Sequence, residues 1–185
     1  MLKSWLPALA LLAAAGLCRA EDEQAEPKPV KYQITGLFSR DRVEDLRKVG
    51  AMLPDVMLVN IDYERAEASF LYDPAKAFKG VKPEEYVKRL DDLVRNASRH
   101  TFGVKPVSTV PRDKLKLVEI KVVGLDCKAC SLAAYEAIFR IDGVEQATAS
   151  FHDGLVTALI EEGKTDRAAL EDALRKRQVQ VLESP

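Results

Sequence analysis

Two cysteines, Cys127 and Cys130, stand three positions apart in the run Gly124-Leu125-Asp126-Cys127-Lys128-Ala129-Cys130. A thiol pair at this spacing can hold a soft metal ion or cycle between a dithiol and a disulfide. The thiolate binds metal, and the free N–H groups and dipole at the start of a helix favour that form. We therefore predict that Cys127 lies in a loop and Cys130 on the first turn of a helix, with both sulfurs facing one volume.

The number of available ligands separates the candidate metals. Two sulfurs suit copper(I), which accepts few ligands, whereas zinc or cadmium needs four ligands and would take the others from elsewhere. Asp126 could give one oxygen to a divalent ion, and a simple helix cap explains it equally well. The predicted metal ligands are thus Cys127 and Cys130, with Asp126 as a third candidate.

Dithiol oxidoreductases use the same cysteine spacing and form the alternative, enzymatic class. Those enzymes place a proline against the cysteine pair, and this chain has no proline between Arg112 and Ser184. We therefore expect a protein that is not an enzyme. A further interpretation is an interaction module whose metal site is vestigial or oxidised to a disulfide.

The elements expected around the pair follow the order strand, helix, strand, strand, helix, strand. Asp153-Gly154 is a strong hairpin signal between two of the strands, and Thr165 is the expected cap of the second helix. This βαββαβ order predicts a ferredoxin-like α+β fold, in which two helices cover one face of an antiparallel sheet. The strand patterns cover residues 117–123, 144–151, 155–160 and 179–181, and the helical patterns cover residues 129–141 and 166–175.

The same pattern occurs earlier in the chain at a fixed offset. Residues 36–72 match residues 124–160 at an offset of 88 positions without a gap. Val59 and Ile61, for example, correspond to Ala147 and Ala149, which are expected to face the core. We therefore predict two tandem ferredoxin-like domains. The predicted domains are 30–107 and 114–182, joined by a linker at 108–113.

The first domain lacks both cysteines. Ser39 and Arg42 stand at the positions of Cys127 and Cys130. A serine hydroxyl does not ionise near neutral pH, and arginine is a permanent cation. The first domain is therefore predicted to be a degenerate copy that keeps the fold, binds no metal and serves for docking or spacing.

The second domain resembles the heavy-metal-associated (HMA) domain family of copper chaperones, mercury-binding periplasmic proteins and N-terminal modules of metal-pumping ATPases. The family signature Gly-Met-x-Cys-x-x-Cys is similar to the run from Gly124 to Cys130, with Leu125 in the Met position. This resemblance implies a metallochaperone-like protein that holds or transfers a metal ion through Cys127 and Cys130. It also implies a metal-transporting ATPase or another metalloprotein as partner.

Two features of this sequence bear on the metal. The family often has Gly-Tyr near the end of the second helix, and this chain has Gln178-Val179 there, without the aromatic residue typical of bacterial copper chaperones. An aspartate before the first cysteine, here Asp126, resembles the zinc, cadmium and lead members. Copper(I) stays the first expectation, with zinc or cadmium as alternatives.

The N-terminus predicts export. Residues 1–20 resemble a secretory signal peptide, with a positive charge at Lys3, an apolar run at 6–17 and small residues before Glu21. We expect a flexible acidic tether at 21–29 to follow it. The apolar run is too short for a comfortable membrane span. We expect a periplasmic or secreted protein with no membrane span after cleavage, the alternatives being a lipid anchor at Cys18 or an uncleaved signal anchor. Lys and Arg total 28 and Asp and Glu 29, which argues against nucleic acid as partner.

Overall fold

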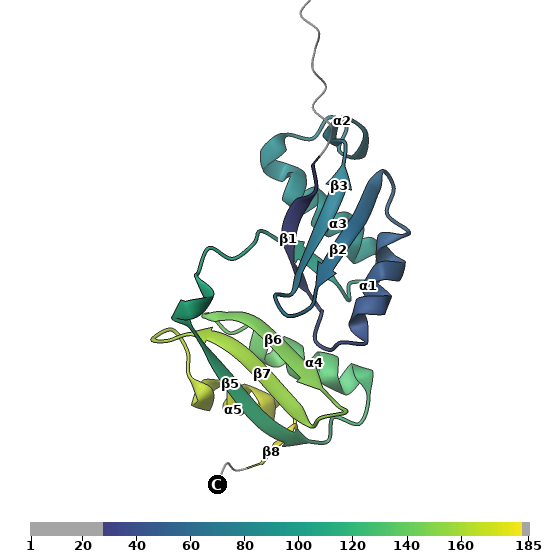
Figure 1. The fold of residues 1–185 in the computed structure, drawn as a ribbon. Coiled ribbons are helices and arrows are strands. Elements are labelled where there is room, and N and C mark those ends of the chain that lie inside the picture. The colour runs from purple at the N-terminus through teal and green to yellow at the C-terminus, as the bar shows by residue number, and fades with distance from the viewer. Residues whose placement is uncertain (1–27, 183–185) are drawn as a thin grey trace, which may run out of the picture.

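The computed structural model describes residues 28–182. The predicted signal peptide and most of the predicted tether lie outside this range. Within it, no helix is long and apolar enough to cross a membrane. The described residues form two units, each with its own sheet and core, seen in Figure 1 as purple to teal and as green to yellow.

The first unit is an antiparallel four-stranded sheet of order β2-β3-β1-β4, with α1 and α3 packed on one face. Its core forms because α1 buries Leu46 and α3 buries Leu90 and Val94 against apolar side chains of the sheet. A short helix, α2, and a 3₁₀ turn at Pro83–Glu85 precede α3. The elements are β1 (Val30–Thr35), α1 (Arg42–Gly50), β2 (Val56–Asp62), β3 (Glu67–Tyr72), α2 (Pro74–Ala77), α3 (Tyr86–Ala97) and β4 (Gly103–Lys105).

The second unit repeats this arrangement with the sheet order β6-β7-β5-β8. Strand β5 buries every second residue, Val118, Ile120 and Val122, which is the period of a sheet with one covered face. A 3₁₀ turn at Arg112–Lys114 leads into it. The elements are β5 (Leu115–Val123), α4 (Lys128–Phe139), β6 (Val144–Ser150), β7 (Leu155–Glu161), α5 (Arg167–Lys176) and β8 (Gln180–Val181).

Both units therefore have the predicted ferredoxin-like α+β fold, and the fold prediction is confirmed. The offset of 88 holds in the register as well, since Ile61 pairs with Ala68 on β3 just as Ala149 pairs with Val156 on β7. The repeat seen in the sequence is thus a repeat of strand pairing.

Two local predictions were wrong. The cap of α5 is Asp166, whose carboxylate accepts a hydrogen bond from the Ala169 N–H at 2.9 Å, and not Thr165. Val59 does not face the core as its counterpart Ala147 does, and is 49% exposed. The reason is a bulge between Leu58 and Asn60 in β2, whereas the bulge in β6 comes earlier, between Val144 and Gln146.

Candidate metal site

The cysteine pair lies where β5 ends and α4 begins, as predicted. Cys127 is the N-cap of α4 in an extended conformation, and its sulfur accepts a hydrogen bond from the Cys130 N–H at 3.3 Å. The two sulfurs lie 2.7 Å apart, and neither cysteine is in a disulfide. Because Cys127 is exposed and Cys130 half-buried, the pair is open to an ion or a partner from solvent.

Hydrogen bonding makes the two thiols unequal. The pKa of Cys127 is lowered, first by the hydrogen bond with the Cys130 side chain and then by the Cys130 N–H. The pKa of Cys130 is raised, chiefly because its own proton is held in that hydrogen bond. The hydrogen bonds from the Cys130 side chain and N–H thus favour one thiolate, at Cys127.

The loop before the pair is held by one buried side chain and one unusual backbone angle. Leu125 is buried in the core of the second unit. Gly124 has φ +84°, a conformation that favours glycine, and nothing lies within 4 Å of where a Cβ would be. Glycine is therefore required here by the turn and not by crowding.

Among residues 28–182, no third ligand lies with the cysteine pair. Across residues 28–182 there is no group of three or more His, Cys, Asp or Glu side chains arranged to hold a metal ion. The role of Asp126 as an oxygen ligand stays a prediction. The donor set at hand, the sulfurs of the exposed Cys127 and the half-buried Cys130, fits an ion that accepts two soft ligands.

In the equivalent loop of the first unit, called the closed loop below, the residues at the two cysteine positions are held in contacts with neighbouring side chains. Ser39 is only 6% exposed and donates a hydrogen bond to Asp41. Arg42 forms an ion pair with Asp45, and its guanidinium lies over the rings of Phe38 and Phe102, at 5.3 and 4.9 Å. The residues that replace the cysteines are thus occupied in structural contacts.

The closed loop of the first unit docks on the second unit through Phe38. This side chain is 1% exposed and belongs to the core of the second unit, where its ring packs on Tyr135 at 5.9 Å. The Phe38 carbonyl accepts a hydrogen bond from the Ala149 N–H on β6 at 2.9 Å. The Gly36 N–H donates to the Tyr135 hydroxyl at 3.0 Å. The closed loop of the first unit therefore helps to hold the two units together.

An ion pair ties the cysteine loop itself to the first unit. Lys128, between the two cysteines, lies 2.7 Å from Asp41 and 3.8 Å from Asp45. Burial raises the pKa of Asp41, but hydrogen bonds from Lys128 and Ser39 outweigh it, and the pKa is lowered overall. The first turn of α4 is thus held in place from the other unit.

No protein-family model matches this chain. Copper-transporting ATPase 2 of Homo sapiens is 23% identical in an alignment of 162 residues that covers 77% of this chain and 11% of that protein. The chain thus spans about a tenth of the length of this curated relative.

Three solved structures are similar to parts of this chain. The CopZ metallochaperone is 25% identical, with a TM-score of 0.36, and covers 36% of this chain and 100% of its own. Oxidized MerP from Ralstonia metallidurans CH34 is 22% identical, with a TM-score of 0.35 and coverages of 37% and 94%. The N-terminal soluble domains of Bacillus subtilis CopA are 18% identical, with a TM-score of 0.35 and coverages of 84% and 92%.

Two residues that shape the surroundings of the site were not singled out by the sequence. Phe38 corresponds at the offset of 88 to the exposed Asp126, and a large apolar residue at that loop position was the available signal. Lys128 gave no signal, because its partner Asp41 lies in the other unit. The comparison of the two loops therefore pointed to a difference in ligands and missed the contact between the units.

Proposed function

We propose that the second unit binds a soft metal ion, copper(I) first of all, through Cys127 and Cys130 and carries it to or from another protein. The observation that carries this proposal is the pair of free cysteines, 2.7 Å apart at the sulfurs and open to solvent at the start of α4. Two thiolates complete a coordination shell for copper(I), whereas zinc or cadmium would need further ligands.

The identity of the ion is supported by a second, independent argument. The curated relative matched over 162 residues is named as a copper-transporting ATPase. A metal-transporting ATPase or another metalloprotein is accordingly the proposed partner. Transfer by exchange of thiolate ligands requires a site that a partner can reach, and Cys127 is exposed. The proposed role is carriage of the ion and not catalysis.

The first unit is proposed to position the site without binding metal. Phe38 in its loop packs against Tyr135 of α4, and Asp41 forms an ion pair with Lys128 on the first turn of that helix. The proposed location, periplasmic or secreted, depends on residues 1–20, which lie outside the described part of the chain.

A competition titration tests the proposal. The reduced chain from residue 21 onward is titrated with copper(I) and with zinc against chelators, and the titration is repeated with Cys127→Ser and Cys130→Ser. Serine is a good N-cap, so Cys127→Ser should keep α4 folded while it removes a ligand. Submicromolar copper(I) binding that both variants lose supports the proposal, and no binding by the reduced wild type overturns it.

Asp126→Asn is the matched variant that separates the metals. If Asp126 gives an oxygen to a divalent ion, this change weakens zinc binding and leaves copper(I) binding as it was, since copper(I) needs only the sulfurs. Equal loss for both ions would instead mean that Asp126 shapes the loop. Catalysed disulfide exchange with a model substrate would favour the redox alternative.

A further inference from the structure

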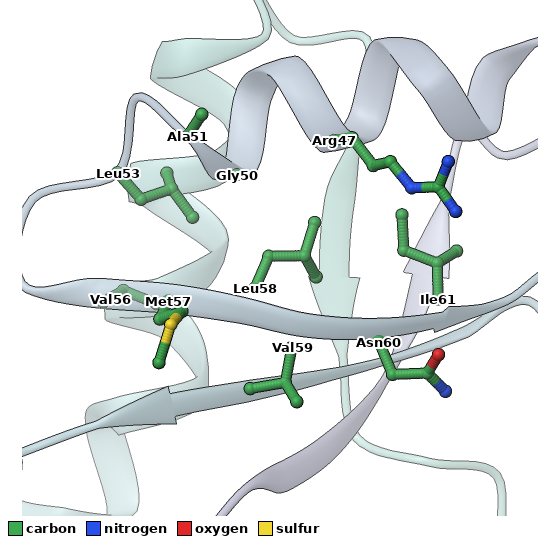
Figure 2. Close-up of a pocket in the computed structure, with 10 residues that line it drawn as sticks. All are labelled: Arg47, Gly50, Ala51, Leu53, Val56, Met57, Leu58, Val59, Asn60 and Ile61. Atoms are coloured by element: carbon green, nitrogen blue, oxygen red, sulfur yellow. The ribbon is translucent and has the colours of Figure 1, made fainter.

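The first unit has an open groove between α1 and the edge strand β2 (Figure 2). Its volume is about 450 Å³, and its lining includes Arg47 and Gly50 on α1 and the strand residues 56–61. Met57 and Val59 are 56% and 49% exposed. Because β2 is the outermost strand of its sheet, its outer N–H and C=O groups face away from the unit and can pair with another segment.

The equivalent groove of the second unit, between α4 and β6, is already filled by a loop. At the offset of 88, Arg47 corresponds to Tyr135 and Ile61 to Ala149. Tyr135 and Ala149 are the residues that receive the loop of the first unit, through the Gly36 N–H, the Phe38 ring and the Phe38 carbonyl. One chain therefore shows this type of groove both occupied and open.

The open groove offers the same backbone group as the occupied one. The Ala149 N–H points away from β7, since it reaches the Phe38 carbonyl. Ile61 has the same register against β3 as Ala149 has against β7, so its N–H points to the outer edge of β2. A loop carbonyl in the open groove would find its donor there.

The loop that matches this groove is the one from Gly124 to Cys130. It is the counterpart of the docked loop, and the two begin with the same turn, at φ +83° for Gly36 and +84° for Gly124. Unlike the docked loop, it lies at the surface, with Asp126 and Cys127 exposed. An exposed copy of the docking loop and an open copy of its groove thus lie on the same chain.

Charge complementarity selects this occupant. At the positions of the aromatic pair Phe38 and Tyr135, the exposed loop has Asp126 and the open groove has Arg47. Figure 2 shows Arg47 reaching from α1 toward Ile61. Its ion pair with Glu44, at 3.6 Å, joins two exposed side chains and is weak, so it competes little with a new partner.

We propose that the groove between α1 and β2 binds the Gly124–Cys130 loop of a second copy of this chain, with Asp126 paired to Arg47. The contact is head to tail, because the loop and the groove lie on different units. A contact of this type adds copy after copy instead of closing a symmetric pair. A single loop buries little area, so the association is weak and shows at high protein concentration.

Sedimentation velocity over micromolar to millimolar concentrations tests the proposal, on the reduced chain from residue 21 with EDTA present. These conditions exclude disulfides and metal bridges between copies. The wild type should gain mass with concentration. Arg47→Asp and Asp126→Arg should each weaken association by about tenfold or more, because each places like charges together. Lys48→Asp, with the same charge change on the outer side of α1, is the matched control and should associate as the wild type does.

A mixture of the two single variants gives the sharpest result. Each variant offers what the other lacks: the Asp126 loop of one fits the Arg47 groove of the other, and Arg at 126 fits Asp at 47. An equimolar mixture should therefore regain association that neither variant shows alone. A wild type that stays monomeric throughout, a mixture that does not regain association, or association insensitive to Asp126→Arg, as symmetric pairing of two β2 edges would give, overturns the proposal.

Discussion

Phe38 and Asp126 occupy equivalent positions in two copies of one loop, and their side chains decide what each loop contacts. The apolar ring of Phe38 is buried in the neighbouring unit, and the loop that carries it has Ser39 and Arg42 in internal contacts. The charged Asp126 stays in solvent, and the loop that carries it keeps its cysteines accessible. At the residue scale, an accessible thiol pair and a docked loop are alternative uses of the same turn.

We predict that Cys127 is alkylated before Cys130. Its pKa is lowered by hydrogen bonds from Cys130, whereas the pKa of Cys130 is raised, so Cys127 has the larger thiolate fraction near neutral pH. Limited iodoacetamide treatment of the reduced protein, read by peptide mass spectrometry, should find the first label on Cys127. The unfolded chain is the control and should label both equally. Equal labelling of the native pair would contradict the prediction.

We predict that Phe38→Ala destabilises the protein by about 3 kcal/mol or more, since it removes a fully buried aromatic ring and leaves a cavity against Tyr135. Urea unfolding measures the change in free energy of unfolding. Met52→Ala removes a side chain that is 59% exposed and should change that free energy by no more than about 0.5 kcal/mol. Similar values for the two variants would mean that Phe38 does not hold the units together.

At the element scale, a capping side chain marks the start of both helices of the second unit. The Cys127 sulfur is both a candidate ligand and the cap of α4, and the Asp166 carboxylate caps α5. The sequence offered Thr165 and Asp166 side by side, and both are good capping residues. Thr165 is not the cap, and its hydroxyl is buried without a hydrogen-bond partner in the described structure.

We predict that Asp166→Ala costs about 1 kcal/mol, because it leaves the Ala169 N–H without its partner. Thr165→Val should cost less and can even stabilise the protein, since it replaces a buried, unpartnered hydroxyl by a methyl group. Urea unfolding of both variants checks the order of the two effects. The reverse order would mean that Thr165, and not Asp166, is the N-cap of α5.

The elements were predictable from the sequence where local patterns determine them. The Asp153-Gly154 hairpin, the helix after the cysteine pair and the order of elements along each unit follow from periodicity and turn residues. The exposure of Val59 was not predictable, because a bulge shifts the face of a strand without changing its sequence pattern. At the site, the position of the cysteines was predictable, but the contacts of Phe38 and Lys128 were not, because they depend on how the two units dock.

At the scale of the whole molecule, the two units are joined by contacts of different kinds. Burial of Phe38 is apolar, the pair of Lys128 with Asp41 is ionic, and the Glu64 carbonyl accepts hydrogen bonds from Arg112 and Gln146, both at 3.2 Å. The arrangement therefore has one apolar anchor and a polar rim, which is typical of a specific interface.

We predict that the contribution of Asp41 to stability disappears in acid. The pKa of Asp41 is lowered in the folded chain, so its ionised form stabilises the fold above the ordinary aspartate pKa, about 3.9. That contribution is lost as the pH falls from there through the lower folded pKa. Comparison of Asp41→Asn with the wild type from pH 7 downward should give a difference of at most about 1 kcal/mol that vanishes in acid. A difference independent of pH would contradict the prediction.

The path from β4 to β5 is short, since the units are joined by residues 106–114, which include prolines at 106 and 111. A short linker raises the effective concentration of one unit around the other, to about the millimolar range where such a linker is flexible. Contacts too weak to hold two separate proteins together are then almost fully formed within one chain. A proteolytic cut in this segment would leave both contact surfaces unchanged, but the two units would then dissociate more readily. Covalent continuity, as much as surface chemistry, thus determines which of the two grooves is filled.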